Sequence, residues 1–495
     1  MICVSIGRGR HRHMIAEHRH LVEQGAQLVE LRLDYIHGQV NLRRLLTDRP
    51  CPVIVTCRRR EDSGKWTDSE SSRTMLLRQA IAEGVEYVDL EEDLAKEIPR
   101  FGETKRIISF HDFSKTPEDL SAIHQRLSAA DADIVKIATM ANKPHDNLRM
   151  LQLIKSTTIP TVGMCMGEIG TPSRLLAGRF GSPFTYSTFH HERSLAPGQL
   201  SFHEMKNIYR YESVDAKTEV FGVIADPVGQ SLSPVLHNAA FQAMGMNRVY
   251  LPFRISVEHL EAFIKDAKNL GIRGISVTIP HKESIIRLLT KADGAVRGIG
   301  AANTVIFDGD ATLGYNTDYR AAMTCIDLAL GTDETDETPL SGMVALMLGA
   351  GGVSKAIVFG LTRRGADVVV ANRTQQRADS LASQFGCRTV PWARRHAISA
   401  DLIVNGTSVG MHPNVDESPY DHRYLRSDMV VFDTVYNPES TFFIKEAVRQ
   451  NCKVITGVEM FIRQAAQQFL LFTGQKAPIE LLRESLKRAT GAVKI

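Results

Sequence analysis

Several segments carry side chains capable of acid–base or nucleophilic chemistry within short apolar runs. Glu30, Arg32 and Asp34 alternate with leucines, so an extended strand would place all three on one face. His111 lies near the end of another apolar run, and Lys136 lies among isoleucine, valine and alanine residues. An inward-facing lysine in an apolar strand is costly as a cation, because burial favours the neutral amine. A neutral amine attacks a carbonyl carbon to form a Schiff base, so this pattern indicates imine chemistry.

Each of these residues also has a purely structural interpretation. A strand lysine can be an edge residue whose ammonium reaches solvent, and His111 can be a hydrogen-bonded core histidine. Glu30 can form a structural ion pair with the neighbouring arginine. The convergence of residue types favours chemistry, because Arg58 and Arg174 also follow apolar runs and arginines bind carboxylates bidentately. We therefore expect a site for a substrate that carries a carboxylate.

The first two hundred residues alternate between short β-branched runs and segments with apolar residues at helical spacing. The runs are residues 2–6, 28–34, 52–58, 87–91, 106–112, 133–139, 161–167 and 184–189. Strand–helix alternation is typical of parallel βαβ units, and eight strands are what a closed (β/α)8 TIM barrel needs. An open doubly wound sheet is the competing architecture. The barrel explains the polar residues, since active sites of that fold lie at the C-terminal ends of the strands.

The motifs of this region resemble those of type I 3-dehydroquinate dehydratases. They occur in the family's order over residues 1–210: ELRLD at 30–34, SFHDF at 109–113, VKIA at 135–138, MG to SR at 166–174, and APGQ at 196–199. The resemblance implies that Lys136 forms an imine with the substrate ketone. It also implies that His111, oriented by Glu30, removes a proton from the neighbouring carbon and then protonates the departing hydroxyl. The implied substrate contacts are Arg32, Arg58, Arg174 and Gln199.

A different pattern of polar residues begins near residue 220. Hydroxyl, amide, ammonium and carboxylate groups follow successive predicted elements there, and together they suit a polyhydroxylated ligand. The candidates are Ser231, Ser233, Thr278, Lys282, Asn303 and Asp318. Taken singly, the two serines could cap the helix that follows them, Lys282 is a common surface residue, and Asp318 is a common helix cap.

A glycine-rich turn, GAGGVS at 349–354, lies between a predicted strand at 344–348 and the start of a predicted helix. Gly349 permits the tight turn, and Gly351 lets backbone N–H groups approach a pyrophosphate at the helix N-terminus. Such a motif alone is weak evidence. A second predicted strand at 367–371 supplies the strand–turn–helix–strand context of a dinucleotide-binding domain.

The residues after that second strand predict which dinucleotide binds. An acidic residue at this place binds the ribose 2′-hydroxyl of NAD, but here Asn372, Arg373 and Thr374 follow the strand and Arg377 is close by. Two arginines and no carboxylate favour a 2′-phosphate, and hence NADP(H). The alternative is that Arg373 is merely a solvated residue at the start of a helix.

From about residue 220 to the C-terminus these motifs resemble those of shikimate dehydrogenases, with further matches at NGTS (405–408) and Gln464. The resemblance implies that Lys282 and Asp318 are the catalytic pair, with Lys282 passing a proton to the carbonyl oxygen as hydride arrives from NADPH. The implied substrate contacts are Ser231, Ser233, Thr278, Asn303, Asp318 and Gln464. The implied cofactor contacts are Gly349, Gly351, Gly352, Asn372, Arg373, Thr374 and Arg377.

The composition is that of an ordinary globular protein of 495 residues, with 43% hydrophobic and 23% charged residues. A formal charge of +3 predicts no nucleic-acid partner, and no apolar run approaches the length of a membrane span. The 7 scattered cysteines indicate neither disulfides nor a zinc site. These features predict a cytoplasmic enzyme with small-molecule substrates and no metal.

We therefore expect three α/β domains: a dehydratase barrel at 1–212, a shikimate-binding domain at 219–320, and a Rossmann domain at 321–495 with C-terminal helices that return to the substrate domain. The acidic stretch at 333–338 predicts a solvated loop. The expected function is bifunctional: dehydration of 3-dehydroquinate to 3-dehydroshikimate, then NADPH-dependent reduction to shikimate, in aromatic amino acid biosynthesis. Two alternatives stay open, a catabolic quinate/shikimate dehydrogenase fusion that uses NAD and a non-catalytic regulatory homologue.

Overall fold

The computed structural model describes residues 1–332 and 338–491, so nearly all of the acidic stretch predicted as a loop lies outside the described residues. The chain divides into two compact units. The first comprises residues 1–222, 227–234 and 245–272, and the second comprises residues 223–226, 235–244 and 273–495. The three-domain boundaries expected from the sequence stay a prediction.

Parallel strands form the centre of the first unit. They are β1 (Ile2–Ile6), β2 (Leu28–Arg32), β3 (Val53–Thr56), β4 (Tyr87–Glu91), β5 (Lys105–Asp112), β6 (Ile134–Met140), β7 (Thr161–Met166) and β8 (Thr185–Thr188). Sequential strands pair in parallel from β1 to β7, and β8 pairs with β1. The predicted (β/α)8 barrel is confirmed, as a nearly closed barrel whose hydrogen-bonded order begins at β7 and ends at β8.

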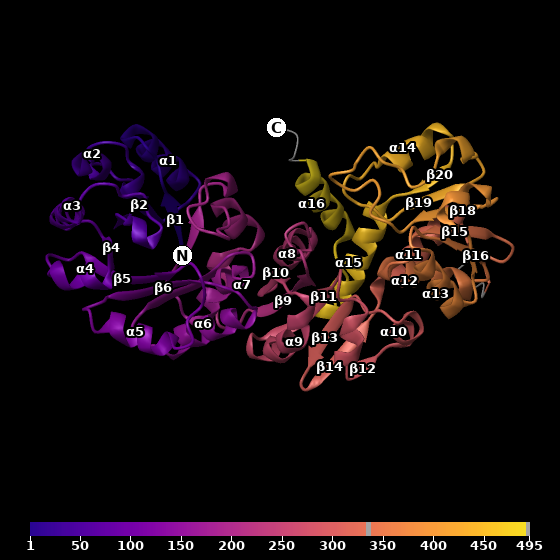
Figure 1. Cartoon of the computed structure of the whole chain (residues 1–495), viewed down its shortest axis with the longest axis horizontal. Helices are drawn as coiled ribbons and strands as arrows, with labels where there is room; N and C mark the ends of the chain where they lie inside the picture. The colour runs from indigo at the N-terminus through magenta and orange to yellow at the C-terminus, as the bar shows by residue number, and fades with distance from the viewer. Residues whose placement is uncertain (333–337, 492–495) are drawn as a thin grey trace. The chain divides into compact units, whose positions relative to one another are not determined.

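Helices connect these strands and surround them (Figure 1). They are α1 (His11–Glu23), α2 (Leu42–Leu46), α3 (Glu70–Ala82), α4 (Glu92–Glu97), α5 (Leu120–Ser128), α6 (His145–Ser156) and α7 (Thr171–Leu176). Side-chain caps explain several starts, since Ser69 accepts a hydrogen bond from the backbone of α3 and Asp119 accepts one from α5. After β8 the barrel ends in short helical elements, among them Glu204–Ile208 and Tyr211–Ser213.

Side-chain alternation divides the barrel interior into an apolar layer and a polar layer. The apolar layer includes Cys3, Leu28, Ile54, Ile107 and Ile134, packed with Phe184 and Tyr186. Two residues further along the same strands, the buried side chains are polar: Ser5, Glu30, Thr56, Ser109 and Lys136. Because alternate residues of a strand share a face, the apolar layer supports a polar layer nearer the C-terminal ends of the strands.

A second sheet has the strand order β10-β9-β11-β13-β14-β12. Its strands are β9 (Glu219–Ala225), β10 (Arg248–Arg254), β11 (Ile272–Val277), β12 (Lys291–Ala292), β13 (Thr304–Asp308) and β14 (Ala311–Tyr315). The helices of this region are α8 (Ser233–Ala243), α9 (Leu260–Asn269), α10 (Gly294–Ile299) and α11 (Thr317–Leu330). Asn316 caps α11 by accepting a hydrogen bond from the backbone N–H of Tyr319, which places Asp318 in the first turn of the helix.

A third, wholly parallel sheet has the order β17-β16-β15-β18-β19-β20. Its strands are β15 (Val344–Leu348), β16 (Asp367–Ala371), β17 (Arg388–Thr389), β18 (Leu402–Asn405), β19 (Val430–Asp433) and β20 (Lys453–Ile455). The helices are α12 (Gly352–Arg363), α13 (Gln375–Phe385), α14 (Phe442–Arg449), α15 (Gly457–Thr473) and α16 (Ile479–Gly491). This order is that of a Rossmann fold, which confirms the prediction, and it places the topological switch point between β15 and β18.

Candidate active sites

The barrel residues predicted to act together line a single cavity at the C-terminal ends of the strands. They are Glu30, Arg32, Arg58, His111, Lys136, Arg174 and Gln199. The cavity wall also includes Asp62, Ser63 and Leu195, which come from loops after β3 and β8. Residues from six different strands and loops thus meet at one place, as the barrel requires.

The amine of Lys136 lies deep in this cavity and is surrounded by carboxylates. Its Nζ donates to Asp89 Oδ2 over 2.8 Å and lies 3.6 Å from Glu30 Oε1. The ammonium also lies 4.2 Å from the centre of the Tyr186 ring. Lys136 is therefore an inward-facing residue and not an edge lysine that reaches solvent, and of the two carboxylates beside it the sequence argument included Glu30 but left out Asp89.

Asp89 and Glu91 on β4 are the site residues that sequence reasoning missed. Both are buried on the inner face, and Asp89 also accepts hydrogen bonds from Ser109 Oγ (2.6 Å) and Arg58 (2.7 Å). Burial opposes the charge of Asp89, but the cations of Arg58 and Lys136 hold its pKa well below the usual value. A sequence signal for them was present, because Tyr87, Asp89 and Glu91 alternate with apolar residues and so share one face of the strand.

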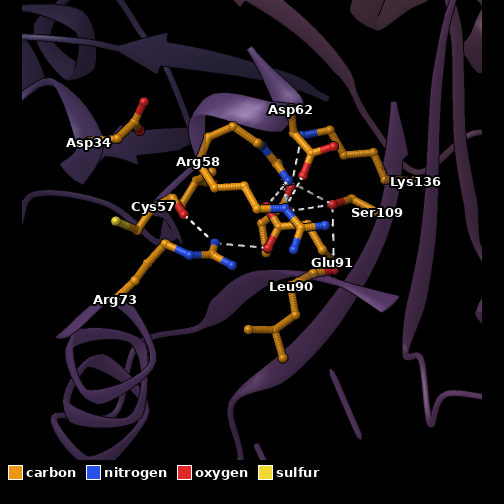
Figure 2. A network of polar contacts seen from close by, with 12 residues as sticks. Asp34, Cys57, Arg58, Asp62, Arg73, Leu90, Glu91, Ser109 and Lys136 are labelled. Carbon is orange, nitrogen blue, oxygen red and sulfur yellow. Dashed lines mark hydrogen bonds and ion pairs between the residues drawn. The ribbon is translucent and has the colours of Figure 1, made fainter. Parts of the chain in front are cut away.

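Arg58 is held by a network of polar contacts (Figure 2). Its guanidinium donates to Glu91 (2.6 Å), Ser109 (3.1 Å) and Asp89 (2.7 Å). The fully buried Arg73 of α3 binds the other oxygen of Glu91 (2.9 Å) and the carbonyl of Cys57 (2.7 Å). Burial opposes the charge of Arg58, but Asp89 and Glu91 raise its pKa above the usual value. Arg58 is thus a fixed cation at the cavity wall.

His111 is placed to act as a base. Burial, together with the cations of Arg58 and Lys136, holds the pKa of His111 well below its usual value, so the imidazole is neutral at pH 7. Its Nδ1 is buried without a hydrogen-bond partner among the described residues. Such an atom in a cavity wall is costly unless a ligand satisfies it.

Glu30 accepts hydrogen bonds from Ser5 (2.6 Å) and Thr56 (2.8 Å) and lies close to the Lys136 amine. The structure therefore places it directly beside Lys136, and its predicted role of orienting His111 stays a prediction. Glu30 is buried, and the two hydroxyl donors hold its carboxylate in place.

Arg174 and Gln199 form another part of the wall. Arg174 is 1% exposed, its Nε has no partner among the described residues, and burial lowers its pKa to about 10. Gln199 Oε1 accepts hydrogen bonds from the backbone of Leu195 (2.8 Å) and Ala196 (3.2 Å), which leaves its amide nitrogen free of that loop. A buried guanidinium with an unsatisfied N–H suits a carboxylate of the ligand.

A second polar site lies in the second unit, between the loop after β11 and the start of α11. Lys282 Nζ donates to Asp318 Oδ2 over 2.6 Å, and Asn303 Nδ2 donates to Asp318 Oδ1 over 2.9 Å. Asn303 is itself held because its Oδ1 accepts the Thr317 N–H (2.8 Å). Three of the predicted residues thus form one hydrogen-bonded group.

The other predicted substrate contacts are located only by the elements that carry them. Thr278 begins the loop that leads to Lys282, and Gln464 is buried on α15, which packs along α11. Ser231 and Ser233 lie in the segment 227–234, which belongs to the other unit, so their position beside this pair stays a prediction.

Gln468, one turn after Gln464, is a residue that the sequence argument missed. It binds Ser276 Oγ (2.8 Å) and the Asn303 carbonyl (3.1 Å). Gln468 therefore ties α15 to the sheet behind Asn303. No sequence motif indicated this role, since the contact joins residues that are far apart in the chain.

The glycine turn after β15 fits a dinucleotide pyrophosphate. Gly349 has φ +110°, and a Cβ there would lie 2.9 Å from the backbone of Gly406. Gly351 caps α12, and a Cβ on it would meet no atom within 4 Å, so open space adjoins the helix N-terminus. A Cβ on Gly352 would lie 3.2 Å from Lys282 Cδ, so the turn lies directly against the Lys282 side chain. The space for a pyrophosphate and the proton-bearing lysine are thus neighbours.

The end of β16 fits a 2′-phosphate. Arg373 and Arg377 are both exposed, and the described residues supply no ion-pair partner for either guanidinium. Asn372 bonds only to a nearby carbonyl, that of Thr374 (2.9 Å). Two free cations and no acid at this position match the donor set that a phosphate requires.

The fold and the site geometry define a fusion of two enzyme modules. One is a barrel whose lysine can form a Schiff base, and the other is an oxidoreductase that binds a nicotinamide dinucleotide. Family models support both: Type I 3-dehydroquinase matches residues 2–216, the shikimate dehydrogenase substrate binding domain 223–305, Shikimate / quinate 5-dehydrogenase 329–433, and the Shikimate 5′-dehydrogenase C-terminal domain 457–487.

Individual relatives agree. A bifunctional 3-dehydroquinate dehydratase/shikimate dehydrogenase of Arabidopsis thaliana, described as chloroplastic, is 34% identical over 97% of this chain and 83% of its own length. The NADP(+) shikimate dehydrogenase of Methanopyrus kandleri is 41% identical over 55% of this chain and 97% of its own. A crystal structure of a shikimate dehydrogenase in complex with NADP+ has a TM-score of 0.52 and 36% identity, and covers 56% of this chain and 97% of that one. The chain belongs to the family of bifunctional 3-dehydroquinate dehydratase/shikimate dehydrogenases.

The described residues carry no sign of a membrane span or of a metal site. No helix there combines the length and apolar character needed to cross a bilayer. No group of three or more histidine, cysteine, aspartate or glutamate residues there has an arrangement that could hold a metal ion.

Proposed function

We propose that this chain catalyses two consecutive reactions, the dehydration of 3-dehydroquinate and the NADPH-dependent reduction of the resulting 3-dehydroshikimate to shikimate. The observation that carries the proposal is that Lys136, His111 and three arginines line one cavity at the ends of the barrel strands. The Lys282–Asp318 pair beside the glycine turn carries the second half.

In the first reaction, the Lys136 amine passes a proton to neutral His111 as it attacks the substrate ketone, and the same proton then goes to the oxygen that leaves as water. Loss of water forms an iminium ion, which acidifies the adjacent carbon. Neutral His111 removes a proton from that carbon, the hydroxyl on the next carbon leaves, and the imidazolium returns its proton to the departing oxygen. Asp89, already 2.8 Å from Nζ, stabilises the iminium charge. Water then releases the product and regenerates Lys136.

In the second reaction, the charged Lys282 donates a proton to the carbonyl oxygen while Asp318 and Asn303 hold the reacting carbon's substituents. The glycine turn, Arg373 and Arg377 would hold NADPH, which would supply the hydride when bound. The role of the chain's own residues is to polarise the carbonyl and to deliver the proton, which a lysine paired with a carboxylate does well.

The two alternative functions are less well supported. A catabolic enzyme that uses NAD would be expected to place an acid at the end of β16, where Asn372 and Arg373 stand. A non-catalytic regulator would have no need to keep Lys136, His111, Lys282 and Asp318 together with their partners. The expected partners are small molecules only, and both the absence of a nucleic-acid partner and a cytoplasmic location stay predictions.

A coupled assay tests the proposed function. The purified chain is supplied with 3-dehydroquinate and NADPH, and NADPH oxidation is followed by absorbance. We expect steady oxidation with NADPH and much slower oxidation with NADH. Oxidation with 3-dehydroshikimate but not with 3-dehydroquinate would overturn the dehydratase half, and no oxidation with either substrate would favour the regulatory alternative.

A further inference from the structure

Asp34, on the turn after β2, connects two parts of the dehydratase cavity. Its side chain is fully buried, and its carboxylate binds Arg32 bidentately, Oδ1 accepting from Nε (2.9 Å) and Oδ2 from Nη2 (2.8 Å). Oδ2 also accepts the backbone N–H of Lys65 over 2.9 Å. One carboxylate thus holds a cavity-lining guanidinium and a loop from the neighbouring strand.

That loop, residues 58–66, follows β3 and supplies Asp62 and Ser63 to the cavity wall. It folds back on its own start: Gly64 N–H donates to the Arg59 carbonyl (2.8 Å) and Trp66 N–H donates to the Arg58 carbonyl (3.3 Å). A Cβ on Gly64 would lie 2.0 Å from the Arg58 carbonyl oxygen, so this close approach requires glycine.

The backbone conformation of this loop is not one that its own residues favour. Ser63 has φ +60°, a left-handed conformation that costs a non-glycine residue free energy and persists where surrounding contacts enforce it. On its outer side the loop is attached by the ion pair of Arg59 with Asp93, whose carboxylate is 60% exposed. Exposed ion pairs contribute little. On its inner side, Arg58 is fixed at the start of the loop, and the buried Asp34 carboxylate is the attachment near its far end.

Aromatic packing beside Asp34 reinforces the same connection. The Arg32 guanidinium lies 5.1 Å from the centre of the Tyr35 ring, and the Lys65 ammonium lies 4.4 Å from it. Tyr35 therefore contacts both groups that the Asp34 carboxylate binds. Burial opposes the charge of Arg32, but Asp34 raises its pKa above the usual value, so the guanidinium stays charged.

We propose that Asp34 is a positioning residue of the dehydratase site, which aims Arg32 at the substrate and pins the loop at 58–66 over the cavity. This inference rests on the proposed dehydratase activity. Asp34 does not line the cavity itself, so it acts through Arg32 and through the loop.

The test compares Asp34→Asn with Asp93→Asn, the matched change at the outer attachment of the same loop. Dehydration is assayed for KM and kcat separately, and reduction of 3-dehydroshikimate serves as the control for folding. We expect Asp34→Asn to raise KM at least tenfold with a smaller fall in kcat, because an asparagine cannot offer two carboxylate oxygens to Arg32. Asp93→Asn should change KM less than threefold.

Loop position is read separately, from quenching of Trp66 fluorescence by acrylamide in a Trp392→Phe background, which leaves Trp66 as the single tryptophan. Asp34→Asn should increase quenching at least twofold, and Asp34→Glu should restore both quenching and KM in part. Gly64→Ala, which displaces the loop without touching Arg32, should increase quenching and lower kcat/KM.

Unchanged KM and quenching in Asp34→Asn would overturn the proposal, as would equal effects of Asp34→Asn and Asp93→Asn. Absence of dehydration in the wild-type chain would instead contradict the proposed function, and the quenching measurement would still report whether Asp34 holds the loop.

Discussion

At the scale of single residues, the chemistry of the barrel depends on one amine. Lys136 is 5% exposed, its Nζ is bound by Asp89, and it is the one lysine among the described residues that line the cavity. We expect Lys136→Ala to lower dehydration at least 10³-fold while leaving NADPH-dependent reduction within about twofold, because the covalent step is lost and the second site is untouched.

Trapping the imine provides the measurement. Incubation with 3-dehydroquinate and borohydride should add the mass of the reduced adduct to the peptide that contains Lys136. Lys105→Ala, on the neighbouring strand β5 but exposed, is the matched control and should be trapped like the wild type. An adduct that persists in Lys136→Ala would contradict the assignment.

Protonation of His111 determines how the rate of dehydration falls at acidic pH. Burial and the nearby cations keep its pKa well below the usual value, so the neutral base persists below the pKa of an ordinary histidine. We expect kcat/KM of dehydration to be flat from pH 8 to pH 6.5 and to fall only at lower pH. A fall already centred at or above pH 6.5 would show that the base is an ordinary, solvated histidine.

At the scale of secondary-structure elements, the end of β16 sets cofactor choice. Arg373 follows this strand and is exposed without an ion-pair partner among the described residues. We expect Arg373→Ala to raise KM for NADPH 10- to 100-fold and that for NADH less than threefold, since a charge-assisted bond to a phosphate is worth roughly 1.5–3 kcal/mol. Arg388→Ala, on the neighbouring strand β17 and paired with Asp367, is the control. Equal losses for the two cofactors would contradict the 2′-phosphate assignment.

The ends of β18 and β19 are joined by a buried carboxylate that has no ion-pair partner in the part of the chain that the structure describes. Asp433 is fully buried and accepts hydrogen bonds from Asn405 (2.9 Å), Thr441 (2.6 Å) and the Val435 backbone (3.0 Å). Burial, only partly offset by these bonds, raises its pKa to about 6. The unfolded chain ionises near pH 3.9, so the cost to stability grows as pH rises from about 4 to 6 and then stays near ~3 kcal/mol.

Asp433→Asn should therefore unfold at a higher temperature than the wild type above pH 6, with the difference vanishing near pH 4. An asparagine retains an acceptor for Asn405 and Val435, and Thr441 can turn its hydroxyl to accept from the amide. The transition is followed by the fluorescence of Trp392 in a Trp66→Phe background. A variant that is less stable than the wild type at pH 8 would show that the charge itself is required.

At the scale of the whole molecule, the two reactions are chemically independent steps in one chain. We expect Lys136→Ala and Lys282→Ala each to abolish NADPH oxidation from 3-dehydroquinate, and an equimolar mixture of the two variants to restore it. The restored rate should rise with total protein concentration, since 3-dehydroshikimate must pass through solvent between molecules. A mixture that stays inactive would show that one substitution disables both sites.

Much of the architecture could be predicted from the sequence. Alternation of short apolar runs with helical periodicity located every barrel strand to within a few residues, because a parallel barrel needs both a buried inner face and helices outside it. The glycine turn and the missing acid after β16 pointed to a dinucleotide site, since only local backbone geometry and residue type were needed.

By itself, the sequence determined the strands, most of the helices and the choice between two nicotinamide cofactors, and it predicted the reactive groups, because each depends on residues that are neighbours in the chain. The tertiary structure alone decided which charges meet. Asp89 balances Lys136, Glu91 joins Arg58 to Arg73, and Asp34 reaches Lys65, and each contact joins different strands or loops. The physical reason is that the energy of a buried charge depends on its partners within a few ångströms, and the barrel brings those partners together from positions 18 to 47 residues apart in the chain.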